Sequence, residues 1–204
     1  MPTFVQENPF SAILSPKARV YTVDIPLNAA ESCRLAALGI ALPEALKKAI
    51  LKRQTEFLAG RYCAHEALTR LGHLPAQATI GIGEDYAPVW PPGFVGSITH
   101  TRGVVAAVVA RTTERSGIGI DVEALLAEDK AVNLASHILT DQEWLRFQSD
   151  GSFNVSELVS LVFSAKESVY KCLRPLTGRY FGFQSAQLLY LDRDSGELDR
   201  KSVV

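Results

Sequence analysis

An α+β fold is the prediction from this sequence, and three observations support it. Each half of the chain contains one long segment, 44–71 or 155–173, whose apolar residues recur at helical spacing. Short runs rich in valine, such as 103–110, are typical of buried strands. The chain has 204 residues, 47% of them hydrophobic, which is enough for one large domain or for two small subdomains that share a core.

The first part of the chain is expected to form a strand and then a helix. Apolar residues over 20–25 indicate the strand. The apolar stripe of 44–71 indicates an almost unbroken helix, which Gly72 ends. Residues 75–97 are rich in Gly and Pro and predict a loop region that holds a short strand around 79–82.

Strands and helices alternate again further along the chain. Residues 103–110 (GVVAAVVA) predict a strand buried on both faces, and residues 117–122 (GIGIDV) predict another. Four later elements are expected. They are a short helix at 133–138, a helix at 140–148 opened by a capping box, a long helix at 155–173 stopped by Pro175, and a strand at 185–191. Each half therefore offers a substantial helix and strands, although no segment repeats.

Composition and charge exclude several classes of protein. The formal net charge of −1 argues against a general nucleic-acid binder. Three cysteines, at spacings that fit no metal site, indicate reduced thiols. The first residues lack the basic start and apolar stretch of a signal peptide, and the longest apolar run, 104–110, is too short to span a bilayer. We therefore expect a cytoplasmic protein with no transmembrane segment.

The motif GIGIDVE at 117–123 places two carboxylates on one face of the expected strand. Because side chains alternate along a strand, Asp121 and Glu123 would face a cleft together, with Gly119 leaving space beside them. Two carboxylates held close repel each other, and oxygen ligands of this kind suit Mg²⁺. A solvated acidic turn is the alternative, and it is favoured for this motif taken alone.

A second motif, FSAKESVYK, lies on the long helix predicted at 155–173. Glu167 and Lys171 are four residues apart and therefore neighbours on one face. Glu167 could complete a metal site with the upstream carboxylates or accept a proton from a hydroxyl, and Lys171 could neutralise a phosphate. The alternative is a surface pair worth only about 0.3–0.5 kcal/mol. The acidic cluster upstream favours a shared ion.

Candidate anion-binding residues lie in two other segments. Arg53 and Arg61, on the first long helix, are about 80° apart around its axis, so one groove could hold both. A tight turn at Gly96 and Ser97 would present Thr99 and His100, whose hydroxyl and imidazole suit a phosphate chain. A solvated helix face and a structural histidine are the respective alternatives.

Four segments carry a family resemblance when they are taken together. They are KRQTEFLAGRYCAHEAL (52–68), WPPGFVGSITHT (90–101), GIGIDVE (117–123) and FSAKESVYKCL (163–173). In this order they resemble the phosphopantetheinyl transferases of the surfactin/enterobactin-synthetase type, most closely the enterobactin-synthetase-like branch. The resemblance implies an α+β fold of two similar α/β subdomains, which we place at 1–112 and 113–204, related by pseudo-twofold symmetry with the ligand cleft between them.

The resemblance also implies a reaction. The 4′-phosphopantetheine group of coenzyme A would pass to a serine of an acyl or peptidyl carrier protein with Mg²⁺ as cofactor, releasing 3′,5′-bisphosphoadenosine. The resemblance implies that Asp121, Glu123 and Glu167 are magnesium ligands and that Glu167 is also the base. It implies that Lys171 and His100 contact the diphosphate and that Lys171 also acts on the leaving group. Thr99 would lie beside the nucleotide, and Arg61 with Arg53 would bind the 3′-phosphate or adenine end. Lys166 belongs to the motif without an assigned role.

Partners and alternatives complete the expectations. A magnesium-dependent diphosphate hydrolase and a non-catalytic module that binds carrier proteins or coenzyme A both stay open. We expect the carrier, serving siderophore or other secondary metabolite synthesis, to dock on 124–153, and a monomer to suffice for the site. The expected apolar docking patch consists of Leu125, Leu126, Ile138, Leu139 and Trp144. In the loop 83–88, two acids depart from the family pattern and are expected to face solvent.

Overall fold

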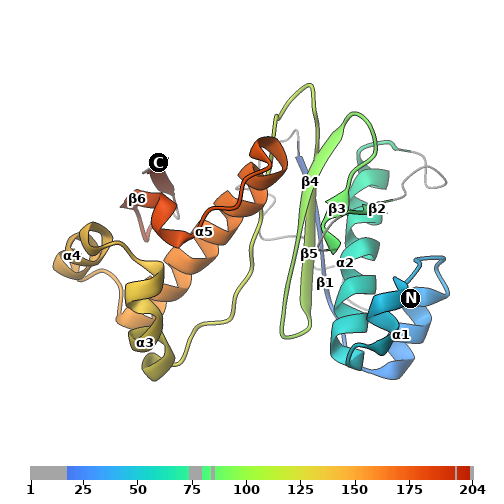
Figure 1. The fold of residues 1–204 in the computed structure, drawn as a ribbon, viewed down its shortest axis with the longest axis horizontal. Helices are drawn as coiled ribbons and strands as arrows, with labels where there is room; N and C mark the ends of the chain where they lie inside the picture. The colour runs from blue at the N-terminus through green and yellow to red at the C-terminus, as the bar shows by residue number, and fades with distance from the viewer. Residues whose placement is uncertain (1–17, 74–79, 84–85, 196, 203–204) are drawn as a thin grey trace.

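The structure, a computed structural model, describes residues 18–73, 80–83, 86–195 and 197–202 (Figure 1). Helices and sheets are mixed along the chain, as an α+β fold requires. In order, the elements are β1 (Ala18–Asp24), α1 (Ala29–Ala36), the 3₁₀ helix η2 (Glu44–Lys48), α2 (Leu51–Arg70), β2 (Gly81–Ile82), β3 (Pro88–Val89), β4 (Phe94–Thr101), β5 (Val104–Arg111), α3 (Glu128–Ile138), α4 (Asp141–Asp150), α5 (Val155–Thr177), the 3₁₀ helix η5 (Phe183–Ser185), β6 (Ala186–Leu191) and β7 (Leu198–Ser202). No helix among the described residues is both long and apolar enough to cross a membrane.

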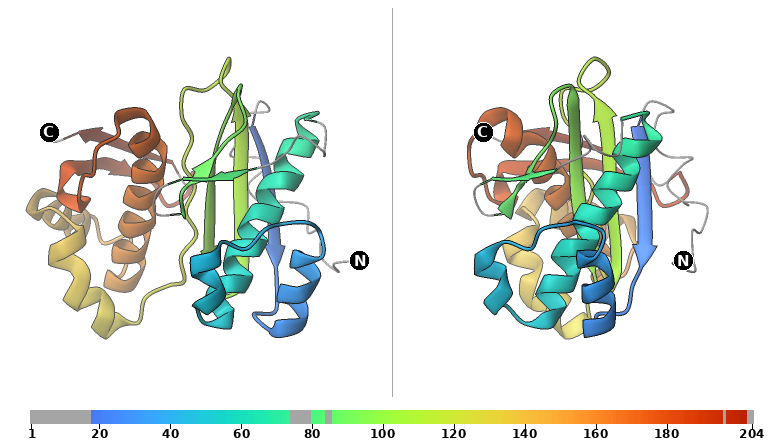
Figure 2. Two further views of the ribbon diagram at one scale, coloured as in Figure 1. Left: turned by 45° about the vertical axis from the view of Figure 1, so that its right-hand side comes forward. Right: turned by 90° about the vertical axis from the view of Figure 1, so that its right-hand side faces the viewer.

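An antiparallel sheet with the order β1-β5-β4 forms the centre of the N-terminal half. The predicted strand at 103–110 is confirmed as β5, and it is buried on both faces. Val105 and Val109 pack against α2, whereas Val108 faces the opposite side of the sheet, where Ile118 and Ile120 cover it. Helix α2 therefore lies on one face of the sheet, and the connection to the C-terminal half runs along the other (Figures 1 and 2).

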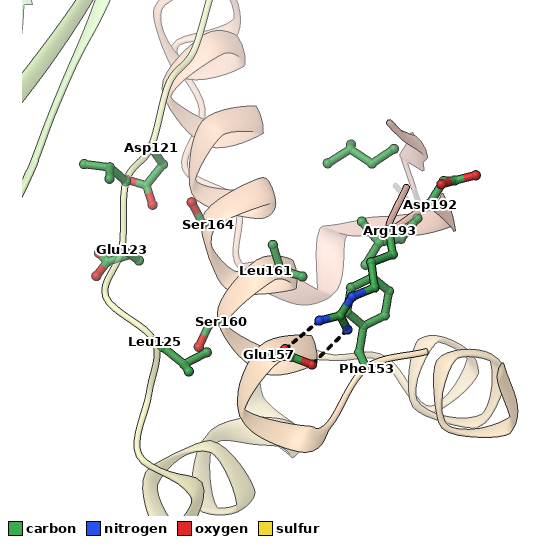
Figure 3. A pocket seen from close by; sticks show the side chains of 13 residues that line it. Asp121, Glu123, Leu125, Phe153, Glu157, Ser160, Leu161, Ser164, Asp192 and Arg193 are labelled. Atoms are coloured by element: carbon green, nitrogen blue, oxygen red, sulfur yellow. Dashed lines mark hydrogen bonds and ion pairs between the residues drawn. The ribbon is translucent and has the colours of Figure 1, made fainter. Parts of the chain in front are cut away.

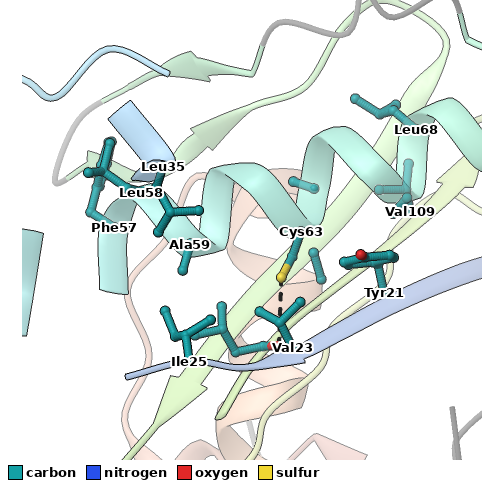
Figure 4. Close-up of a cluster of buried hydrophobic side chains, with 14 of the residues drawn as sticks. Tyr21, Val23, Ile25, Leu35, Phe57, Leu58, Ala59, Cys63, Leu68 and Val109 are labelled. Atoms are coloured by element: carbon teal, nitrogen blue, oxygen red, sulfur yellow. Dashed lines mark hydrogen bonds between the residues drawn. The ribbon is translucent and has the colours of Figure 1, made fainter. Parts of the chain in front are cut away.

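The predicted helix over 44–71 is interrupted. A 3₁₀ turn buries Leu46, and Ala49 then adopts an extended conformation with ψ 162°, so that α2 begins only at Leu51. The side-chain amide of Gln54 donates to the carbonyls of Lys47 and Ala49, and these bonds satisfy the broken turn. The core that α2 makes with β1 is drawn in Figure 4. The predicted end of α2 is confirmed, since Gly72 has φ 80°.

Glycine and proline after α2 do not all lie in a loop. The expected tight turn at Gly96 and Ser97 is wrong, because both residues belong to β4. A Cβ on Gly96 would lie 2.6 Å from the Trp90 ring, so this glycine lets the indole lie on the strand. The actual turn is at Arg102 and Gly103, with φ 45° and 94°, the left-handed pair that tight hairpins require. The short strand expected around 79–82 is confirmed at Gly81–Ile82, and Thr79 lies outside the described residues.

The C-terminal half packs α3, α4 and α5 with the β6–β7 hairpin around a second core. The capping box is confirmed, with Thr140 accepting from the backbone of Glu143, and the late strand is confirmed as β6. The short helix expected at 133–138 begins earlier, at Glu128, and β7 was not predicted. Pro175 does not stop α5, because it lies in the last turn, and Gly178 with φ 64° ends the helix.

Residues 117–122 do not form the predicted strand. Ile118 and Ile120 pack against the sheet, as their alternation predicts. The other side of the segment lies against α5, where a Cβ on Gly117 would be 3.0 Å from the carbonyl oxygen of Cys172. The segment therefore lies between a sheet face and a helix and has no neighbouring strand with which to form a ladder (Figure 2).

Candidate active site

Gly119 fixes the distance between the acidic segment and α5. A Cβ on this residue would lie 1.9 Å from the carbonyl oxygen of Ser168, closer than any side chain permits. The space expected beside the carboxylates is thus filled by the backbone of α5 and is not open to a ligand. This close approach brings Asp121 within reach of the side chains on α5.

Asp121 is the most constrained residue of the site. Its Oδ1 accepts from Thr99 Oγ1 at 3.0 Å and from Lys171 Nζ at 2.6 Å. Thr99 Oγ1 in turn accepts from the backbone N–H of Val122 at 3.1 Å, which locks the segment to β4. The side chain of Asp121 is 3% exposed, yet its Oδ2 has no hydrogen-bond partner in the part of the chain that the structure describes. Such an orphaned carboxylate oxygen requires an explanation, and a ligand is one.

Glu123 and Glu167 share the electrostatic environment of Asp121. Partial burial raises the pKa of Glu123, and the charge of Asp121 raises it further. Burial also raises the pKa of Glu167. The charge of Lys171 lowers this pKa, and the charges of Asp121 and Glu123 raise it. The three predicted acids therefore influence one another electrostatically, although Glu167 comes from a segment far from Asp121 and Glu123 in the sequence.

The donor set fits a magnesium ion. No three His, Cys, Asp or Glu side chains among the described residues approach closely enough to hold a metal together. Mg²⁺ does not need three, because it usually takes one or two carboxylates and completes its shell with water and substrate phosphates. The buried, unpartnered Oδ2 of Asp121 is one suitable ligand, and Glu123 and Glu167 are the nearby carboxylates that could add a second.

A basic group, which consists of His100, Arg53 and Arg61, lies near Lys171. His100 on β4 has its Nε2 3.1 Å from Arg53 Nη1 and its Nδ1 3.6 Å from Glu56 Oε2. Burial lowers the pKa of His100. The charges of Arg53 and Lys171 also lower this pKa, whereas the charge of Glu56 raises it. The imidazole is therefore neutral at neutral pH. Glu56 was not predicted as part of the site, and its i,i+4 spacing from Lys52 was the available signal.

Arg61 is less accessible than the sequence suggested. It is 7% exposed, stacks over the Phe57 ring and donates from Nη2 to the carbonyl of Tyr86 at 3.0 Å. Burial, with a smaller contribution from the charge of Arg53, lowers the pKa of Arg61 to about 10. Gly60 does not expose this arginine, because it faces Ile98 across the helix–sheet contact. The two acids expected to face solvent, at 84 and 85, lie outside the described residues.

A groove of about 560 Å³ extends from the acids along α5 (Figure 3). Asp121 and Glu123 lie at one side, and apolar side chains that include Leu125 and Leu161 line it. The predicted apolar patch is only partly correct. Leu125 is 59% exposed, but Ile138 and Leu139 belong to the core of the C-terminal half, and Leu126 and Trp144 pack against that core. Leu161, which lies on α5 ten residues before Lys171, was not predicted.

Both halves of the chain match models of one protein family. Residues 42–110 match the 4′-phosphopantetheinyl transferase N-terminal domain, and residues 117–202 match the 4′-phosphopantetheinyl transferase superfamily.

Similar proteins carry the same family name. The chain is 38% identical over 145 residues to 4′-phosphopantetheinyl transferase Npt of Nocardia iowensis, which covers 71% of the chain and 63% of the relative. It is 33% identical over 151 residues to 4′-phosphopantetheinyl transferase PptT of Mycobacterium tuberculosis, covering 74% and 64%. Enterobactin synthase component D of Escherichia coli O157:H7 is 35% identical over 157 residues, covering 77% of the chain and 71% of the relative.

The chain thus aligns with about three fifths of the length of the first of these relatives. The two family matches together cover most of the chain, and the second one contains both Asp121 and the helix that carries Glu167. This chain belongs to the 4′-phosphopantetheinyl transferase superfamily.

Proposed function

We propose that the chain transfers the 4′-phosphopantetheine group of coenzyme A to a serine of an acyl or peptidyl carrier protein. The observation that carries the proposal is the buried Asp121 carboxylate, with one oxygen held by Lys171 and the other without a hydrogen-bond partner among the described residues. Around it, residues 1–112 and 113–204 form two subdomains related by pseudo-twofold symmetry, and coenzyme A binds in the cleft between them. The family membership of the chain and the names of its relatives support this reaction.

Of the three predicted magnesium ligands, Asp121, Glu123 and Glu167, we assign the ion to Asp121 and one of the two glutamates, because no three such side chains among the described residues approach closely enough to hold a metal together. The bound ion supplies charge neutralisation and alignment of the diphosphate. Thr99 and Lys171 act beside the ion. Thr99 keeps Asp121 in place from β4 and flanks the nucleotide. Lys171, 27% exposed and already beside Asp121, lies where it can neutralise the leaving group.

Proton transfer is assigned to Glu167. The serine oxygen forms a bond to the β-phosphorus of coenzyme A while the bond from that phosphorus to the bridging oxygen breaks. The serine proton passes to Glu167, and 3′,5′-bisphosphoadenosine leaves with its new charge facing Lys171. Because burial raises the pKa of Glu167, it is a better proton acceptor than an ordinary surface carboxylate.

The nucleotide end of coenzyme A is assigned to the basic group. Neutral His100 contacts the diphosphate, and Arg53 with Arg61 binds the 3′-phosphate or the adenine end. The closeness of Arg53 to His100 supports this, as does the mutual repulsion of the two arginines, which an anion would relieve.

Arg53→Met is expected to raise the KM for coenzyme A by about 10- to 100-fold, the effect of one lost charge-assisted hydrogen bond, with a smaller change in kcat. Initial rates at varied coenzyme A concentration measure this. Lys48→Met is the matched control, because Lys48 is an exposed cation on η2. Equal KM values for both variants and the wild type would remove Arg53 from the site.

Carrier loading itself is tested by mass spectrometry. The protein is mixed with coenzyme A, Mg²⁺ and an apo carrier protein, and the carrier is expected to gain one phosphopantetheine. Chelation of Mg²⁺ should prevent the gain. Cleavage of coenzyme A without any acceptor would indicate the diphosphate hydrolase, and tight coenzyme A binding without turnover on several unrelated carriers would indicate the binding module.

The carrier is proposed to dock over 124–153, with Leu125 as the apolar contact next to the acids. Leu125→Glu is expected to raise the KM for the carrier by about tenfold or more, as loss of an interface anchor does, and to leave coenzyme A binding unchanged. Leu38→Glu is the control, because Leu38 is 53% exposed, lies outside 124–153 and does not line the groove. Weaker coenzyme A binding with normal carrier binding would contradict this placement.

A further inference from the structure

Lys166, the motif residue without an assigned role, is buried away from the site. Its side chain is 1% exposed, and its partner Glu143 is fully buried. The ammonium donates to Glu143 Oε2 at 2.7 Å and to the carbonyl of Ile138 at 2.8 Å. Two of its three N–H groups are thus held by partners in the C-terminal half.

Glu143 connects three elements through this ion pair. Its Oε2 also accepts from the backbone N–H of Thr140 at 2.6 Å, at the start of α4. Its Oε1 accepts from the backbone N–H of Leu188 on β6 at 2.7 Å. Lys166 thus attaches α5 to a carboxylate whose position α4 and β6 have already fixed.

Stability alone does not account for a buried ion pair. Apolar residues of similar volume often replace such a pair with no loss of stability, because desolvation offsets the attraction between the charges. Charge-assisted hydrogen bonds differ from apolar contacts in being directional. The pair therefore defines one rotation of α5 about its axis, where an apolar contact would tolerate several.

Rotation of α5 matters because of the residue that follows. Glu167 lies about 100° further round the helix, and Lys171 lies one turn beyond it. With a carboxylate about 6 Å from the helix axis, a rotation of roughly 10° moves it by about 1 Å. A misplacement of about 1 Å can reduce catalysis roughly 100-fold.

We infer that Lys166 is a positioning residue, which through its buried pair with Glu143 fixes the rotation of α5 and so places Glu167 and Lys171 opposite Asp121. The inference rests on the proposed transfer reaction. Gly119 defines the distance of α5 from the acidic segment, and Lys166 defines its rotation.

The test variant is Lys166→Met combined with Glu143→Gln, which removes the buried charges together and keeps an amide oxygen for a backbone N–H. We expect kcat per folded molecule to fall by about tenfold or more, with the KM for coenzyme A within about twofold of wild type. The half-saturating Mg²⁺ concentration should rise. Calorimetric titration of Mg²⁺ into the protein with coenzyme A present gives a readout that needs no turnover, and weaker Mg²⁺ binding is expected there too.

Arg146→Met is the matched control. Arg146 attaches α4 to β6 by donating to the carbonyls of Leu188 and Leu189. The Arg146→Met variant should have a lower unfolding midpoint, with kcat per folded molecule and Mg²⁺ binding unchanged. An equal loss of kcat in this control would mean general loosening and would overturn the inference, as would wild-type kcat and Mg²⁺ binding in the double variant.

Two further measurements keep the inference testable. If the double variant does not fold, Lys166→Gln takes its place, with the folded fraction measured by urea unfolding, and the same two outcomes decide. If the wild type loads no carrier, the proposed reaction fails, and the Mg²⁺ titration of wild type and variants alone decides whether Lys166 positions the acids.

Discussion

Asp121→Asn is expected to reduce carrier loading by roughly a thousandfold or more at ordinary Mg²⁺ concentrations. The asparagine amide keeps the size of the side chain but removes the negative charge from the oxygen that has no protein partner. A metal ion contributes several kcal/mol of charge stabilisation in reactions of this kind, and each 1.4 kcal/mol is about a factor of ten in rate. The loss should fall on kcat, because coenzyme A retains its contacts with the basic group.

The measurement is single-turnover loading followed by mass spectrometry, with urea unfolding in parallel. Lys171 is partly exposed and loses its partner without being trapped in the core, so unfolding should change little. Asp24→Asn is the control, because Asp24 is an exposed acid at the end of β1, outside the proposed site and the docking segment. Full activity of Asp121→Asn at ordinary Mg²⁺ would be incompatible with the proposed scheme.

The long helices were predictable from the helical spacing of their apolar residues, and the buried strand from its continuous valine-rich run. The prediction for 117–122 failed for a specific reason. Alternation of side chains shows that a segment is extended with one side buried, but not whether a strand or a helix lies beside it. Here the neighbour is α5, which the two glycines admit. Likewise, nothing local to 44–71 shows that Gln54 satisfies a broken turn at Ala49.

The site was predictable to the extent that its residues lie in recognisable motifs. Asp121 and Lys171 are far apart in sequence and meet as the motifs suggested. Residues that act by contact with other elements were missed. Glu56 reads as an ordinary helix acid, and Glu143 reads as half of a capping box, because their second partners come from β4 and α5. Such roles depend on tertiary packing, which spacing in one segment does not reveal.

The acidic segment and α5 are held together by the absence of a side chain at Gly119, and Gly119→Ala is the direct test. An added Cβ would lie 1.9 Å from a backbone oxygen that cannot rotate away, so the segment and the helix must separate. Overpacking of this kind costs about 1–3 kcal/mol, and we expect the upper part of that range. Separation also moves Asp121 from Lys171 and Glu167, so kcat should fall by about 100-fold, as for a displacement of about 1 Å.

Gly182→Ala separates this contact from the general effect of replacing glycine. A Cβ there meets nothing within 4 Å, and Gly182 has φ −87°, which alanine adopts without strain. It should change the free energy of unfolding by less than about 0.5 kcal/mol and leave kcat unchanged. Urea unfolding and carrier loading are measured on both variants. If Gly119→Ala matches Gly182→Ala in unfolding free energy and in kcat, the close approach does not hold the site together. If Gly119→Ala loses both stability and kcat, the backbone contact with Ser168 positions the acids as firmly as any side chain in the site.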